Sequence, residues 1–106
     1  MQGGIEVAVT LFSNNALVVV SETGTLGSIA TVRGSAGVGG VDCRWVSGQH
    51  GERLEVLARQ ISERVIHTNG YAGELVLTLG LRPASLNEVE LLRSVVACVA
   101  GLKIWS

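Results

Sequence analysis

Residues 16–21 read Ala-Leu-Val-Val-Val-Ser, and this run decides the expected fold. It is apolar at consecutive positions and rich in β-branched side chains, which favour strands. A strand with apolar side chains on both faces is typical of a central strand that is covered on both sides. Larger apolar side chains recur at every second position of residues 5–12, which predicts a strand with one strongly apolar face. The intervening Ser-Asn-Asn at 13–15 is turn chemistry, so the two runs predict a hairpin.

Three more strands and a helix are expected after this hairpin. Residues 28–33, 41–46 and 74–80 are short β-rich runs, and turn residues separate the first of them from the hairpin. Between the last two, apolar side chains fall at i, i+3, i+4, i+7 and i+11 over residues 54–65, the spacing of one helical stripe. Asn69-Gly70 supplies a C-terminal stop for this helix.

A second helix is expected to begin at Ser85 and to end at Gly101. Ser85 and Glu88 have the spacing of a capping box, with Pro83 just outside it. The expected element order is therefore β-β-β-β-α-β-α in a single domain, residues 1–106. The fold class is α+β, with an antiparallel sheet that starts as a meander of three strands and carries both helices on one face.

The sheet looks apolar on both faces, yet two helices cover only one of them. We place Leu17 and Val19 on the helix side, together with the leucines of residues 74–80. A bare apolar face of that size is uncommon on a monomer, so a partner chain or a second copy is expected to cover the other face. The alternatives are that one or two strands have the opposite phase, or that the tail after Gly101 folds over. The expected interface residues are Val18, Val20, Val32 and Val76.

Composition narrows the class of protein. The chain has 106 residues, 47% of them hydrophobic, and a net charge of −1, so it has no basic excess for nucleic acid. Its apolar runs are too short to span a membrane as a helix, and its start lacks the pattern of a signal peptide. Cys43 and Cys98 match no metal-ligand spacing and fit a reducing compartment. We expect a soluble protein of the cytoplasm, with the nucleus as a second compartment.

Residues that carry chemistry are scarce. His50 and His67 flank the first helix without a nucleophile motif nearby, and the pairs Glu52/Glu55 and Glu88/Glu90 lie on helix faces or caps. The glycine-rich residues 34–40 match neither a dinucleotide-binding nor a Walker fingerprint. We therefore expect no catalytic residue, no cofactor and no metal, and a protein that is not an enzyme.

Residues 16–32 resemble the central hairpin of the proteasome assembly chaperone 3 family, with a triple-valine strand, a glycine-containing turn and a third strand. The similarity continues in the order and spacing of later segments, and Leu-Arg-Ser-Val-Val-Ala-Cys at 92–98 looks like the family's C-terminal helix. The resemblance implies a non-enzymatic chaperone. It would pair with a related subunit, assembly chaperone 4, and help to order α-subunits into the ring of the 20S proteasome.

With the far face of the sheet assigned to the partner, the surface left for an α-subunit is the sheet edge and the 34–40 loop. The charged helix faces come second. Glycine-rich loops tolerate change, and small polar contacts suit a transient partner. The loop departs from the pattern expected of the family. Its expected contact residues are Gly34, Ser35, Gly37, Gly39 and Gly40.

Two other classes compete with the chaperone. One is a roadblock- or longin-like scaffold of a trafficking complex, which shares a five-stranded sheet with helices. Such folds usually place a helix early, whereas four strands come first here. The other is a small enzyme whose site forms at an oligomer interface, for which the apolar strands offer few titratable groups.

Overall fold

A computed structural model describes residues 5–22, 27–34, 40–48 and 51–102 of the chain, and only the backbone at positions 83 and 84. Residues 52–68 form one continuous helical segment, whose last turn is a π-helix, η1. The elements are β1 (Ile5–Leu11), β2 (Asn15–Glu22), β3 (Ser28–Gly34), β4 (Val41–Ser47), α1 (Glu52–Glu63), η1 (Arg64–Thr68), β5 (Glu74–Gly80), α2 (Pro83–Leu86) and α3 (Val89–Ala100).

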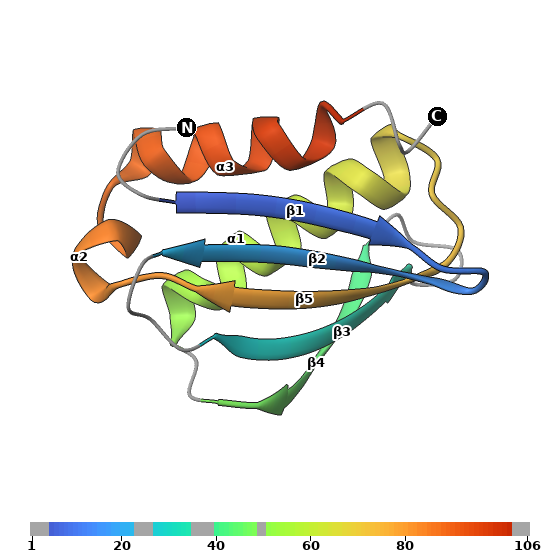
Figure 1. Cartoon of the computed structure of the whole chain (residues 1–106), viewed down its shortest axis with the longest axis horizontal. Helices are drawn as coiled ribbons and strands as arrows, with labels where there is room; N and C mark the ends of the chain where they lie inside the picture. Colours follow the sequence, from blue (N-terminus) through green and yellow to red (C-terminus); the bar gives the residue numbers. More distant parts are fainter. Residues whose placement is uncertain (1–4, 23–26, 35–39, 49–50, 103–106) are drawn as a thin grey trace.

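The described strands form one five-stranded sheet in the order β1-β2-β5-β3-β4, and α1 and α3 pack together on one face of it (Figure 1). The expected α+β class, with a five-stranded sheet and two main helices, is confirmed. The order of these elements along the chain is also the expected one, apart from the added short helix α2.

The prediction that the first three strands form a meander is wrong. β5 lies between β2 and β3, parallel to β2 and antiparallel to β3, so one ladder of the otherwise antiparallel sheet is parallel. Neighbouring strands are about 4.8 Å apart, and each residue of an extended chain spans about 3.3 Å. The residues between Glu22 and Ser28 are therefore long enough to pass the end of β5. β5 thereby takes the centre of the sheet, where β2 and β3 cover both of its edges.

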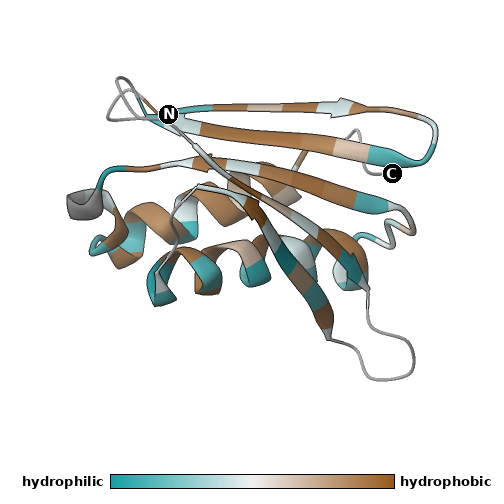
Figure 2. Cartoon of the chain, turned by 90° about the horizontal axis from the view of Figure 1, so that it is seen from below, coloured by the Kyte–Doolittle hydropathy of each residue, from teal (hydrophilic) through white to brown (hydrophobic). Residues whose placement is uncertain are grey.

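The core lies between the sheet and the helices. Every second residue of the central strands faces the helices and is fully buried: Val18 and Val20 in β2, and Leu75 and Leu77 in β5. The brown, hydrophobic sides of the helices in Figure 2 face the sheet, and the teal sides face away from it. Leu57 and Ile61 of α1 and Val95 and Val99 of α3 are the large side chains of these helices that are fully buried against the sheet.

The second helix differs from its prediction. It is split into α2 and α3 by Asn87 and Glu88, and Glu88 is the N-cap of α3 without a side-chain hydrogen bond. Ser85 is therefore not a capping residue: it lies inside α2, and its hydroxyl donates to the Glu22 carboxylate at 2.9 and 3.0 Å. A buried carboxylate costs free energy unless donors surround it, and this requirement fixes where the Ser85 hydroxyl points.

Candidate protein-interaction surfaces

The expected partner interface needs correction. Val18, Val20 and Val32 are completely buried, face the helices and belong to the core of this one chain. Of the four predicted residues only Val76 points to the other side of the sheet, where it is half-buried. Leu17 and Val19, expected beneath the helices, share that side with it. The consecutive apolar residues of β2 show no alternation in the sequence, so the sequence fits either phase, and the structure has the opposite phase to the predicted one.

The face opposite the helices, here called the open face, has an aliphatic centre. Leu17 stands beside Val76 across the parallel ladder, and Val19, Thr78 and Ile29 form the next row. These side chains are half-buried by one another, and no described helix lies on them (Figure 2). Closely spaced aliphatic groups between charged margins are typical of a surface that binds protein.

Charged side chains border the aliphatic centre on both sides. Arg33 Nε donates to Glu74 Oε2 at 2.9 Å on this face. Glu6 lies on β1, and Asp42 and Arg44 lie on β4, all three exposed. Exposed ion pairs add little to stability, so these charges bear on which partners are accepted more than on folding.

The 34–40 loop is only partly described. Gly34 is exposed at the end of β3, and Gly40 is half-buried at the start of β4. His67 in η1 donates from Nε2 to the Gly40 carbonyl oxygen at 2.8 Å, which ties the loop's end to the helical layer. The other predicted contact residues, Ser35, Gly37 and Gly39, lie outside the described residues.

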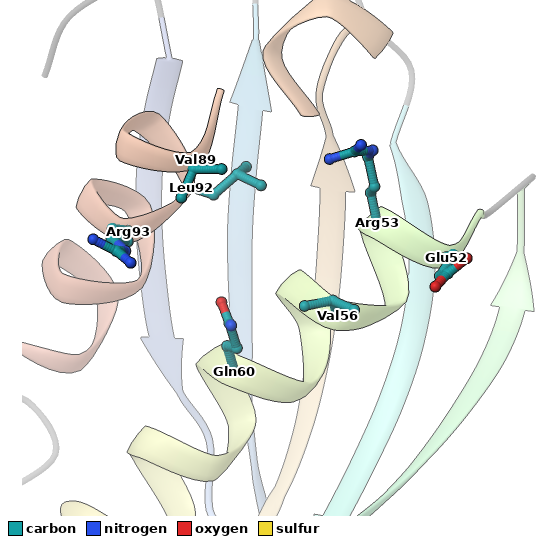
Figure 3. Close-up of a pocket in the computed structure, with 7 residues that line it drawn as sticks. All are labelled: Glu52, Arg53, Val56, Gln60, Val89, Leu92 and Arg93. Carbon is teal, nitrogen blue, oxygen red and sulfur yellow. The ribbon is translucent and has the colours of Figure 1, made fainter. Parts of the chain in front are cut away.

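A hollow of about 460 Å³ lies between α1 and α3 on the outer surface of the helical layer. In Figure 3, Val56 and Gln60 line it from α1, while Val89 and Leu92 line it from α3. Val56 is 47% exposed and Val89 56%, so the hollow has an apolar floor that the chain itself leaves open. Charged side chains border it: Glu52, Arg53 and Arg93.

Of the paired glutamates considered for acid–base chemistry, Glu55 and Glu90 form structural contacts. Glu55 in α1 accepts a hydrogen bond from Trp45 Nε1 at 3.3 Å and pairs with Arg59 at 3.6 Å. Glu90 pairs with Arg93 one turn later in α3. Within residues 5–22, 27–34, 40–48 and 51–102, no three His, Cys, Asp or Glu side chains come together as a metal site would require. His50 lies outside these ranges.

Both cysteines are free thiols and half-buried. Burial raises the pKa of the Cys43 thiol, and the nearby Glu55 carboxylate raises it further, while Arg59 opposes the shift. A protonated thiol is a poor nucleophile, so the environment of Cys43 is that of a packing residue.

Sequence reasoning missed the buried carboxylate of Glu22. Glu22, at the end of β2, is 8% exposed and accepts hydrogen bonds from the Arg82 backbone N–H at 2.7 Å and from Ser85. The Arg82 N–H is the main cause of a lowered Glu22 pKa; the Ser85 hydroxyl and the Arg82 charge add to it, while burial opposes it. Glu22 thus joins the end of β2 to the segment after β5. An acidic residue beside a predicted turn gave no sign of this role.

These observations define the class of the chain only as a mixed α+β domain with helices on one face of its sheet and an aliphatic open face on the other. No protein-family model matches the chain, and no curated protein does. Among the described helices, none has the length and hydropathy that crossing a membrane requires.

Proposed function

We propose that this protein is a non-enzymatic assembly chaperone of the cytoplasm and nucleus that helps α-subunits of the 20S proteasome to form their ring. In this proposal its open face binds a related subunit, similar to assembly chaperone 4, or a second copy of itself. The open face is the observation that carries the proposal, because a sheet face with an aliphatic centre gains free energy when a second protein covers it. The link to the proteasome rests on the resemblance of residues 16–32 and of the later segments to the proteasome assembly chaperone 3 family.

The α-subunit contact is assigned to the loop of residues 34–40 and the sheet edge beside it. The hollow between α1 and α3 is the second choice, because Val56 and Val89 offer an apolar floor there. The hollow lies on the helix side of the sheet, and the described ends of the loop, Gly34 and Gly40, lie at the ends of β3 and β4. A partner subunit on the centre of the open face therefore leaves both positions free for an α-subunit.

The partner surface is tested by capture from native lysate and mass spectrometry. Val76→Asp puts a charge into the centre of the open face, where a partner would have to bury it, so the related subunit is expected to be lost. Val56→Asp is the matched control: it changes the same residue type to the same charge, but in the helical hollow. Equal capture of a related subunit by both variants, with both folded by circular dichroism, would exclude the open face as the interface.

The function is tested by depletion. Removing the protein is expected to lower the yield of complete α-rings in native gels, while proteasomes already assembled keep their activity. Shortening the 34–40 loop is expected to weaken α-subunit capture without unfolding the domain. Unchanged assembly intermediates after depletion would contradict the chaperone proposal and favour the trafficking scaffold.

A further inference from the structure

β4 is one of the two edge strands of the described sheet. β4 is the last strand in the sheet order, and Figure 1 shows no described helix or strand beyond it. An edge strand presents a row of unpaired backbone N–H and C=O groups that another strand can join. A helix packs against each edge strand, α3 against β1 and α1 against β4, so the side chains of β4 rather than its exposure distinguish it.

Cys43 lies at the centre of β4, between side chains of opposite charge. The central residues of the strand read Val41-Asp42-Cys43-Arg44-Trp45. Asp42 and Arg44 are exposed, and neither forms an ion pair with any residue in the described ranges. The strand therefore carries one acidic and one basic side chain, two residues apart on one side, with a small thiol between them on the other.

We propose that β4 pairs antiparallel with β4 of a second copy, with the twofold axis at Cys43. In this register Asp42 of each copy stands opposite Arg44 of the other, so two ion pairs form across the seam. On the helix side, Val41 stands opposite Trp45 of the second copy, and the two Cys43 side chains face each other. Directly opposed side chains of opposite charge stabilise an antiparallel ladder.

The neighbouring registers are unfavourable. Directly opposed residues of an antiparallel ladder point to the same face of the sheet. In a symmetric pair of identical strands the twofold axis must therefore pass through a residue, and the neighbouring registers move the axis by one whole residue. An axis at Asp42 would oppose two aspartates, and an axis at Arg44 would oppose two arginines. Like charges placed directly opposite one another destabilise a ladder. The charge pattern therefore selects a second copy and one register of it, which is specificity by both attraction and repulsion.

The pairing extends the sheet. A twofold axis between antiparallel strands stands perpendicular to the sheet, so both copies keep their helices on one side and their open faces on the other. The contact is one short ladder per copy, small by the standard of stable interfaces, so a reversible association that grows with protein concentration is expected. The inference does not rest on the proposed function. The pairing leaves the open face free, but it uses the sheet edge beside the 34–40 loop, so a second copy and an α-subunit would compete for that edge.

Cross-linking through Cys43 tests the register. Opposed residues of an antiparallel pair have Cα atoms about 4.5–5.5 Å apart, within the range that a disulfide bridges. The full-length Cys98→Ala variant is oxidised with copper phenanthroline at alkaline pH over several hours, because the raised pKa of the Cys43 thiol slows its reaction. It is expected to give a disulfide dimer on non-reducing gels. The matched Cys43→Ala variant, which keeps Cys98, is expected to stay monomeric. A Cys98→Ala chain that gives no dimer, even at high concentration, would overturn the proposal.

Charge reversal tests the complementarity in the same assay. Asp42→Arg leaves only arginines at the seam and Arg44→Asp only aspartates, so each variant alone is expected to cross-link about tenfold less. A mixture of the two opposes arginine with aspartate again and is expected to restore the dimer as a mixed species. Both positions are exposed, so circular dichroism is expected to show an unchanged fold. If each single charge-reversal variant cross-links as efficiently as the Cys98→Ala parent, the proposed ion pairs at the β4 edge are refuted.

Discussion

Val18 and Val19 are adjacent in β2 but face opposite sides of the sheet, and alanine substitutions of the two separate the core from the open face. Val18 is completely buried against the helices, whereas Val19 is half-buried on the open face. The substitutions are chemically identical and have the same effect on strand propensity. Any difference in stability between Val18→Ala and Val19→Ala therefore measures the two environments.

The expected difference follows from burial. Each variant loses two carbon atoms, and a buried CH₂ group is worth about 0.8 kcal/mol, which gives about 1.6 kcal/mol for transfer alone at Val18. The cavity left behind in a packed core raises the cost to about 2–3 kcal/mol. At Val19 part of the side chain is in water already and no enclosed cavity forms, so the cost is expected to be about 1 kcal/mol or less.

Urea denaturation followed by far-UV circular dichroism gives both free energies of unfolding, and the slope with urea shows whether unfolding stays two-state. A loss of 2–3 kcal/mol at Val18 corresponds to a fall in melting temperature of about 10 °C or more for a domain of this size. Equal costs at the two positions, or a larger cost at Val19, would refute the phase of β2 and with it the open face. Concentration dependence of the Val19→Ala midpoint at fixed urea would instead report a contribution of this side chain to association.

Three further predictions concern single contacts. Ser85→Ala is expected to lower the free energy of unfolding by about 1–2 kcal/mol in the same urea assay, because the Ser85 hydroxyl donates to a buried carboxylate. The control Ser94→Ala, on the exposed face of α3, is expected to change it by less than about 0.5 kcal/mol, and equal costs would contradict the Glu22 contact. The pKa of Glu22 in the folded chain is below its ordinary 4.5, so the ionised carboxylate stabilises the fold above about that pH, and this gain in stability disappears as the pH falls through the folded pKa. The melting temperature of Glu22→Gln is therefore expected to depend less on pH in this acidic range than that of the wild type. Parallel curves of melting temperature against pH would contradict this prediction. Gly48 and Gly70 both have positive φ, but only at Gly48 would an added Cβ meet a neighbour, Ser28 Oγ at 2.7 Å. Gly48→Ala is therefore expected to cost clearly more stability than the roughly 1 kcal/mol expected of Gly70→Ala. Similar shifts in melting temperature for the two variants would contradict the close packing at Gly48.

The kinds of element were predictable from the sequence because each has a local cause. The stripe of residues 54–65 is a property of one helix, and the strand segments end at glycine, asparagine or serine. The phase of β2 was not predictable in the same way. Its run from Leu17 to Val20 is apolar at every position, so either parity fits, and only packing against α1 and α3 decides between them.

The neighbours of β5 were also beyond local reasoning. Sequential strands are adjacent in space more often than not, and that rule favours a meander. The segment between Glu22 and Ser28 is long enough for a hairpin and also long enough to cross the end of another strand. The choice depends on the gain in burying β5 between β2 and β3, a long-range term with no signature in either turn. Glu22 was missed for the same reason, because its donors follow sixty residues later.

The open face and the β4 edge meet at right angles, and this geometry determines how they combine. Pairing through β4 adds strands in the plane of the sheet and therefore covers none of Leu17, Val19, Val76 or Ile29. It places two aliphatic faces side by side on one surface, each still available to a partner that stacks on it. Linked sites of this kind bind a similarly paired partner more tightly than either site alone, because the second contact forms within the complex. Hence a variant that breaks the edge, such as Asp42→Arg, is expected to weaken capture through the open face without removing it, whereas Val76→Asp is expected to abolish capture and leave the Cys43 cross-link intact.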